Sequence, residues 1–317
     1  MAAKLTNGEE RIYASGDITE GTTEKFLAFV HQHNVEAATV SFNSPGGSLV
    51  EGMKLGHAIR ALEFSTTVGG FQPKYDPTVN PKTICASACV YAFAGGTGRY
   101  IDQYTGRLGV HQFYSNDDAG VSGETAQQVS GLVVAYLDQM GVDAKAFTLS
   151  TFANRDGVIW LSPSEALELR FANNGVELPT AEIKLANMTP YLKLEQNKAS
   201  ATIRILFNCY KKQVHFVFGI VTDPTTSGMI GENQKRSYLE LDNKEFLAVP
   251  GKTGARANQS VVWLERSMTP STLLQVLEAD SVGGWVDGFG AVRYGGTLDM
   301  PTVRAKAAEF AKQCYGL

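Results

Sequence analysis

Two short segments of the sequence supply a candidate nucleophile and a candidate general base. Ser87 lies in Cys-Ala-Ser-Ala-Cys (85–89), at the start of an expected short helix over 86–94. His111 lies in an apolar run, 108–113, that we expect to be a strand. A serine hydroxyl becomes nucleophilic when a neighbouring histidine accepts its proton, and the positive end of a helix dipole favours the alkoxide. The pair therefore indicates acyl-transfer chemistry.

A third segment could stabilise the oxyanion of such a reaction. Asn43-Ser44-Pro45-Gly46-Gly47 stands between an expected strand over 38–42 and an expected helix over 48–63. Adjacent glycines let the backbone approach a ligand closely, and their amides can point at a developing negative charge. The amide of Ala88 is a second candidate donor beside Gly46 and Gly47.

Each segment also has an ordinary structural interpretation. The glycine pair suits a tight turn from strand to helix. Ser87 could be a helix N-cap, a position at which serine is common. A single histidine near the end of a strand is more often a satisfied core residue than a base. The function therefore depends on the three segments occurring together and in this order.

In that order, the segments resemble the motifs of ClpP-like serine peptidases of the ClpP/crotonase superfamily. The matching residues are Asn43 to Gly47 with Gly52, Ala86-Ser87-Ala88, and Val110-His111-Gln112. The form Cys-Ala-Ser-Ala-Cys is most similar to bacterial periplasmic, ATP-independent ClpP-like proteins. The resemblance covers about residues 10–175.

The resemblance implies a serine endopeptidase in which Ser87 attacks a peptide bond and His111 is the general base. It also implies an oxyanion hole formed by the amides of Gly47 and Ala88. The third member of the triad lies, in the family, just before the helix that begins here at Ser162. Asp156 is the acidic residue nearest to that position in the sequence. In the alternative interpretation, Asp156 is only a turn residue in Arg-Asp-Gly (155–157).

The four cysteines leave two interpretations open. The envelope location of similar proteins favours a disulfide between Cys85 and Cys89 and another between Cys209 and Cys314. Four reduced thiols in the cytosol are the alternative. Residues 1–8 are polar and have no hydrophobic signal core, so we expect a periplasmic or envelope protein without its signal peptide here, or else a cytoplasmic one.

The elements that must position these residues alternate between strand and helix. Such alternation predicts an α/β fold with a mostly parallel sheet, and the resemblance implies a ClpP/crotonase-like domain of ββα repeats over 1–180. A polar stretch over about 174–201 contains Pro179 and Pro190, and its part 181–200 is expected to be a linker. A smaller α+β domain of unknown role, with a hairpin formed by 202–208 and 214–221, is expected over 201–317.

Composition excludes several classes of function. With 317 residues and a net charge of −4, the chain lacks the basic character of a nucleic-acid-binding protein. It contains no apolar run of the roughly 20 residues that a membrane span needs. No Cys or His spacing typical of a metal site occurs, and no cofactor is expected. The resemblance implies a peptide or protein substrate and, because relatives often form rings or layers, a homo-oligomer.

Three competing functions remain open at this stage. A non-catalytic binding or scaffold protein could use the same fold without an ordered serine–histidine pair. A crotonase-type acyl-CoA enzyme would share the oxyanion amides but would leave Ser87 and His111 without a role. A serine–lysine dyad would use Lys82 or Lys145, although His111 fits the helix-then-strand order better.

Overall fold

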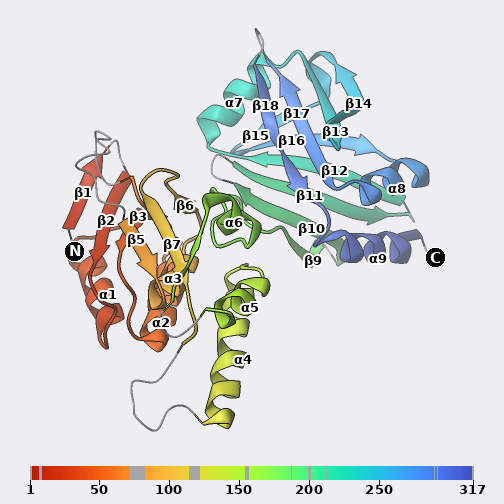
Figure 1. The fold of residues 1–317 in the computed structure, drawn as a ribbon. Coiled ribbons are helices and arrows are strands. Elements are labelled where there is room, and N and C mark those ends of the chain that lie inside the picture. Colours follow the sequence, from red (N-terminus) through yellow and green to blue (C-terminus); the bar gives the residue numbers. More distant parts are fainter. Residues whose placement is uncertain are drawn as a thin grey trace. The chain divides into compact units, whose positions relative to one another are not determined.

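The chain divides into two compact units, residues 1–175 and 176–317, which Figure 1 shows in a computed structural model. The structure describes residues 2–6, 9–70, 83–113, 122–153, 157–186, 188–198, 201–211, 213–288, 290 and 292–315. The first unit is α/β with mostly parallel strands, and the second contains antiparallel sheets and helices. The expected fold class, an α/β domain followed by a smaller α+β domain, is confirmed.

The first unit contains a five-stranded sheet in the order β1-β2-β3-β4-β6. Its strands are β1 (Ala2–Thr6), β2 (Glu9–Ser15), β3 (Ala38–Asn43), β4 (Ser65–Val68) and β6 (Arg99–Ile101). Only the β1–β2 pair is antiparallel. The helices between its strands are α1 (Thr22–Gln32), α2 (Leu49–Ala61) and α3 (Ala88–Ala94), and all three were expected. Strand–helix alternation thus builds the parallel sheet that the sequence predicts.

A smaller three-stranded sheet lies beside the first, and Ser87 and His111 directly follow two of its strands. Its strands are β5 (Thr83–Ala86), β7 (Gly106–Val110) and β8 (Ile159–Leu161), with β5 and β7 parallel. Ser44 joins the sheets, because its N–H donates to the Ile84 carbonyl (2.7 Å) and its carbonyl accepts from the Ala86 N–H (3.1 Å). The strand expected over 108–113 ends at Val110, so His111 directly follows it.

The remaining helices of this unit are α4 (Gly123–Gln139), α5 (Lys145–Thr151) and α6 (Pro163–Glu168). The sequence Ser-Pro-Ser-Glu at the start of α6 forms a capping box. The Ser162 hydroxyl accepts from the Glu165 N–H, and the Glu165 carboxylate accepts from the Ser162 N–H. Two of the four unpaired N–H groups at that helix start are satisfied in this way.

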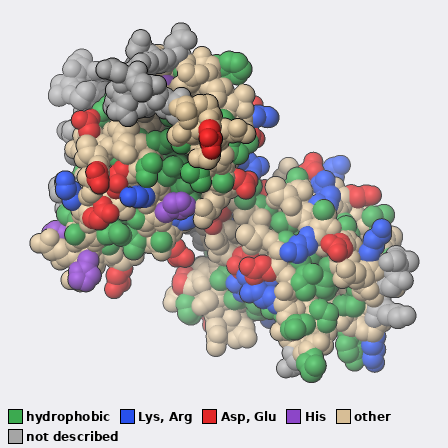
Figure 2. All heavy atoms as spheres, turned by 90° about the horizontal axis from the view of Figure 1, so that it is seen from below, with side chains coloured by type: hydrophobic (Ala, Val, Ile, Leu, Met, Phe, Trp, Pro, Cys, Tyr) green, Lys and Arg blue, Asp and Glu red, His purple; other side chains and the backbone are tan. Residues whose placement is uncertain are grey.

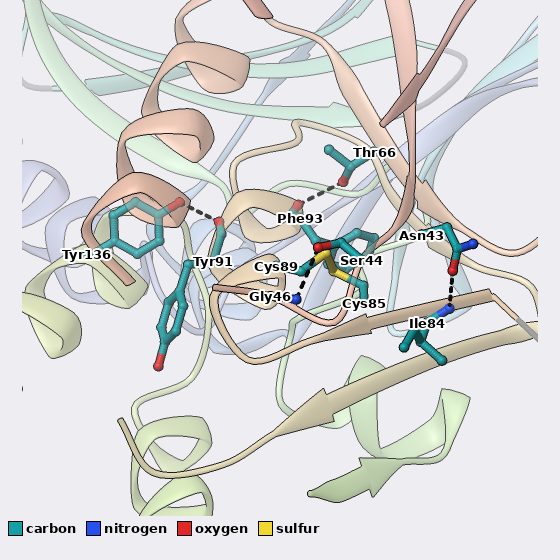
Figure 3. Close-up of a disulfide and its surroundings, with 10 residues drawn as sticks. All are labelled: Asn43, Ser44, Gly46, Thr66, Ile84, Cys85, Cys89, Tyr91, Phe93 and Tyr136. Carbon is teal, nitrogen blue, oxygen red and sulfur yellow. Dashed lines mark hydrogen bonds between the residues drawn. A yellow bond between two sulfur atoms is a disulfide. The ribbon is translucent and has the colours of Figure 1, made fainter. Parts of the chain in front are cut away.

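Helices α2 and α3 pack closely because α2 carries glycines on the face toward α3. Every residue of α3 is buried. A Cβ atom at Gly52 would lie 2.3 Å from the Ala88 carbonyl oxygen, and one at Gly56 would lie 1.9 Å from the Tyr136 hydroxyl. That hydroxyl donates to the Tyr91 carbonyl (2.6 Å; Figure 3). Burial raises the pKa of the Tyr136 hydroxyl, so it stays a hydrogen-bond donor at neutral pH.

The described residues of the second unit form two antiparallel sheets, three α-helices and a short 3-10 helix (Gly251–Thr253). One sheet has the order β15-β16-β12-β11-β10-β9 and the other β14-β13-β17-β18. The strands are β9 (Thr180–Ala186), β10 (Thr189–Lys198), β11 (Ala201–Tyr210), β12 (Gln213–Val221), β13 (Arg236–Leu241), β14 (Lys244–Pro250), β15 (Arg256–Asn258), β16 (Val261–Ser267), β17 (Ser281–Asp287) and β18 (Arg293–Asp299). The helices are α7 (Pro224–Asn233), α8 (Pro270–Glu278) and α9 (Arg304–Tyr315). One apolar core joins both sheets to the helices, and a disulfide between Cys209 and Cys314 links β11 to α9.

Two features of this unit differ from the sequence-based expectation. Most of the segment 181–200 is not a linker, because it forms β9 and β10. Its polar composition arises because Leu192 and Leu194 face the core while the residues between them face outward, as in a half-exposed strand. Helix α7 was not expected, since it is rich in Thr, Ser and Gly, although Asp223 as N-cap followed by proline is a helix-start signal.

The mixture of acidic and basic side chains on the surface agrees with the small net charge. Figure 2 shows acidic and basic side chains interspersed with hydrophobic ones on the face that it displays. In the described parts of the chain, no helix is both long enough and apolar enough to cross a bilayer.

Glycine substitutions test the close packing of α2. Gly56→Ala should lower the free energy of unfolding by about 1–3 kcal/mol, because the added methyl group collides with the Tyr136 hydroxyl and with the Tyr91 carbonyl. Gly131→Ala in α4 is the matched control. A Cβ there meets nothing within 4 Å, so the same change should raise stability by up to about 1 kcal/mol. Urea unfolding measures both, and equal effects would contradict this packing.

Candidate functional site

The turn between β3 and α2 is held in place by the two residues that precede its proline. The Asn43 side-chain oxygen accepts from the Ile84 N–H (3.1 Å), and the Ser44 hydroxyl accepts from the Gly46 N–H (3.1 Å), as Figure 3 shows. Gly46 has φ 106° and Gly47 has φ 138°, values that side-chain-bearing residues rarely adopt. The Gly46 amide is committed to Ser44, so it is not one of the oxyanion donors that the sequence suggested.

Ser87 occupies a strained elbow between β5 and α3. Its φ of 54° and ψ of −126° are unusual for a residue with a side chain and cost about 1–3 kcal/mol. The Ser87 N–H donates to the Gly109 carbonyl in β7 (3.0 Å). A disulfide joins Cys85 in β5 to Cys89 in α3, and both cysteines are fully buried (Figure 3). The hydrogen bond to β7 and the disulfide therefore hold Ser87 in this strained conformation.

Ser87 differs from the other serines that begin helices in this unit. Ser48, Ser122 and Ser162 have extended backbones, and each hydroxyl accepts a hydrogen bond from the N–H three residues later. The Ser87 side chain makes no such capping bond. An N-cap role therefore does not explain a serine at this position.

A hydrogen bond at Nδ1 favours one neutral tautomer of the His111 ring. Nδ1 is within hydrogen-bonding distance of the Gln112 carbonyl oxygen. A carbonyl can only accept, so Nδ1 carries the proton and Nε2 carries the lone pair. The Gln112 side chain donates to the Thr151 carbonyl (2.6 Å), which ties this segment to α5.

Four of the predicted site residues line one cleft of about 690 Å³. Ser87 and Ala88 contribute the start of α3, His111 follows β7, and Gly47 belongs to the glycine turn. Ser87 and His111 are both partly exposed, so solvent and substrate can reach them. Its apolar lining includes the side chains of Ile18, Leu49, Val50, Val90, Val110 and Phe113. Asp17 and Glu20 add negative charge, and among the described residues no Lys or Arg lines it.

Two backbone amides at the cleft are available to a ligand. Ala88 is the first residue of α3, where an N–H has no acceptor within the helix. Within the described ranges, the N–H groups of Gly47 and Ala88 donate to no protein acceptor. Both therefore suit the binding of an anionic oxygen.

The other predicted residues lie elsewhere or beyond what the structure describes. Asp156 and Lys82 are outside the described residues. Lys145 begins α5 and does not line the cleft. Among the described residues, no group of three or more His, Cys, Asp or Glu side chains could hold a metal ion.

One wall of the cleft was not predicted from the sequence. The segment 17–20 follows β2 and pairs with the glycine turn through Ile18, whose N–H donates to the Gly46 carbonyl (2.7 Å). A Cβ at Gly47 would lie 2.2 Å from the Ile18 carbonyl oxygen. The flanking glycines, Gly16 and Gly21, both have positive φ and signal a loop. They do not reveal which part of the fold that loop contacts.

Glu51 of α2 contacts the start of α1, which follows the segment 17–20. Its buried carboxylate accepts from the Thr23 N–H (2.9 Å) at the start of α1. Hydrogen bonding to Thr23 lowers the pKa of Glu51, an effect that burial opposes. The ionised carboxylate therefore fixes α1 and the preceding segment against the helix that carries Leu49 and Val50 into the cleft.

No family model matches the sequence, and no curated protein matches it. Solved structures do show similarity. ClpP1 from Listeria monocytogenes is 18% identical, with a TM-score of 0.39 over 51% of this chain and 88% of that chain. A serine-to-alanine variant of the membrane-bound stomatin-specific protease 1510-N is 19% identical, with a TM-score of 0.37 over 51% and 76%. Its lysine-to-alanine variant with a substrate peptide is 19% identical, with a TM-score of 0.38 over 51% and 72%. These similarities leave the function to be argued from the chain's own residues.

The strain at the elbow predicts an unusual effect of glycine. Ser87→Gly should raise the free energy of unfolding by about 1 kcal/mol, because glycine adopts φ 54° without penalty and this gain outweighs the greater freedom of the unfolded chain. Ser87→Ala keeps the strain and should change stability little. Urea unfolding under oxidising conditions measures both variants, and a Gly variant less stable than the Ala variant would refute a strained elbow.

The Glu51 contact predicts a pH-dependent stability difference. Because the folded-state pKa of Glu51 is lowered, its stabilisation is present above the ordinary value of 4.5 and is lost as the pH falls through the folded pKa. Glu51→Gln should therefore lower the melting temperature at pH 7, and the difference from the wild type should shrink on acidification. Melting curves from pH 7 to pH 3 test this, and a constant difference would contradict it.

Proposed function

We propose that the chain is a serine peptidase that cleaves peptide bonds through an acyl-enzyme on Ser87. One observation carries the proposal. In the described part of the chain, a serine in a strained elbow that makes no capping bond shares a cleft with a histidine and with two backbone amides that have no protein acceptor. Positive-φ strain in a side-chain-bearing residue concentrates at functional sites, where it directs the side chain outward.

In the proposed mechanism, Nε2 of His111 accepts the proton of the Ser87 hydroxyl as its oxygen attacks the peptide carbonyl carbon. The carbonyl oxygen becomes an oxyanion and accepts hydrogen bonds from the N–H groups of Gly47 and Ala88. The tetrahedral intermediate collapses, and His111 gives its proton to the leaving amine. Water then attacks the acyl-enzyme with His111 again as the base, which releases the acid and restores Ser87.

The hydrogen bond from Nδ1 of His111 to the Gln112 carbonyl gives part of the support that a triad acid supplies, because it fixes the tautomer. A carboxylate would additionally stabilise the imidazolium. Asp156 is the residue that we propose for this role, on the resemblance alone.

The charge of the cleft disfavours an acyl-CoA substrate. Coenzyme A carries several phosphate charges, for which a binding site normally provides Lys or Arg, and among the described residues neither lines this cleft. Asp17 and Glu20 would repel these phosphates. The apolar lining suits the side chains of a peptide instead.

We also propose that the protein functions in the periplasm or cell envelope. Disulfides persist in oxidising compartments and are rare in the cytosol. Both pairs of cysteines are bridged in the structure, and no described cysteine is free. The similarity of the Cys-Ala-Ser-Ala-Cys segment to periplasmic ClpP-like proteins supports the same location.

A fluorophosphonate probe tests the nucleophile. The probe should label the wild type, whereas Ser87→Ala should abolish labelling and His111→Ala should slow it by about 10²–10⁴-fold through loss of the base. Intact-mass spectrometry measures the adduct.

Ser48→Ala is the matched control, because Ser48 lines the same cleft and caps α2. It should be labelled like the wild type while losing about 1 kcal/mol of stability. Equal labelling of Ser87→Ala and wild type would remove Ser87 from the mechanism. A wild type that is folded but never labelled would favour a non-catalytic scaffold protein.

A further inference from the structure

Strand β9 is an exposed edge of the six-stranded sheet. It pairs with β10 on one side and is the last strand in the sheet order. Ile183 is 51% exposed and Leu185 is 73% exposed, although both lie on the face of the sheet that carries the buried Leu192. Natural proteins usually cover or disrupt such edges, because the unpaired backbone groups can template another strand.

The backbone groups of alternate β9 residues point away from β10. Leu185 lies opposite Pro190, which has no N–H to donate. The Ala181 carbonyl accepts from the Lys306 ammonium group of α9 (3.0 Å), which agrees with a carbonyl that points away from β10. Since hydrogen-bonded and non-bonded pairs alternate in an antiparallel ladder, Ala181, Ile183 and Leu185 present their N–H and C=O groups outward.

The sequence of β9 is complementary to itself in an antiparallel arrangement. If Ile183 meets Ile183 of a second copy, Glu182 lies opposite Lys184 of that copy, and Lys184 lies opposite its Glu182. Ala181 then lies opposite Leu185, so a small side chain meets a large one. The outward N–H and C=O groups of Ile183 and Leu185 and the N–H of Ala181 fall in register for hydrogen bonding, whereas the Ala181 carbonyl already accepts from Lys306.

We propose that β9 pairs antiparallel with β9 of a second copy of this chain, about a twofold axis at Ile183. The arrangement is an isologous interface that extends one sheet across two copies and removes the exposed edge of each. It is independent of the proposed peptidase function, because it uses only the second unit.

Charge supports a second copy as the occupant rather than an unrelated strand. Glu182 and Lys184 already lie 3.1 Å apart on one face and are about half exposed, and Lys193 of β10 lies 3.8 Å from Glu182. Pairing about the twofold axis places each of the two charges opposite its counterpart on the other copy. A strand of arbitrary sequence would leave one or both of these cross-strand ion pairs unmade.

Charge reversal tests the pairing in the full-length chain. Glu182→Lys and Lys184→Glu should each weaken dimerisation by about tenfold or more, because the twofold axis turns both cross-strand ion pairs into repulsions. The double variant Glu182→Lys with Lys184→Glu restores opposite charges across the axis and should recover most of the affinity. Sedimentation velocity over a dilution series distinguishes the 34.2 kDa monomer from a species of twice that mass.

Two further variants keep the test specific. Lys244→Glu reverses a charge on β14, the edge strand of the other sheet, and should leave dimerisation unchanged. Ile183→Pro removes an outward N–H while sparing the bonds to β10, so it should give a folded monomer with an unchanged circular dichroism spectrum. A wild type that remains monomeric at high concentration, or a dimer that the single reversals do not weaken, would overturn the proposal.

Discussion

The positive φ of Ser87 is the constraint on which the arrangement of the site depends. A side-chain-bearing residue holds this conformation only if its surroundings compensate the strain. Here the Ser87 N–H donates to the Gly109 carbonyl in β7. The buried disulfide between Cys85 and Cys89 also fixes the chain on both sides of Ser87. The elbow ends β5 and begins α3 within one residue, which places the Ser87 hydroxyl and the Ala88 amide at the same cleft.

The rest of the first unit brings other groups to that elbow. Ser44 connects the end of β3 to β5, so the glycine turn lies beside Ser87, and a Cβ at Gly46 would lie 2.6 Å from the Ser87 Cβ. The parallel pairing of β5 with β7 places His111, which follows β7, at the same end of the small sheet. The site therefore forms where two sheets meet, at the carboxyl ends of parallel strands, which is where α/β proteins commonly bind ligands.

Much of this organisation could be predicted from residue types and periodicity. The helices α1 to α3, the strand–helix alternation and the segments around Gly47, Ser87 and His111 follow from local patterns. The strain at Ser87, the role of Ser44 in occupying the Gly46 amide, and the wall formed by Ile18 do not, because each depends on contacts between distant segments. The sequence of β9 alternates apolar and polar residues over only a few positions, and the polar composition and prolines of the surrounding segment indicated a linker instead.

In the proposed mechanism, Ser87 attacks a carbonyl whose oxygen then lies between two backbone amides. A crystal structure of the protein after reaction with a peptide boronic acid tests it most directly, because boron forms a tetrahedral adduct with a nucleophilic serine. We expect a bond from boron to the Ser87 hydroxyl oxygen, one boronate oxygen within about 3.1 Å of the N–H nitrogens of Gly47 and Ala88, and Nε2 of His111 beside the adduct. A boronate bound to another residue, or an adduct whose oxygens face away from both amides, would contradict it.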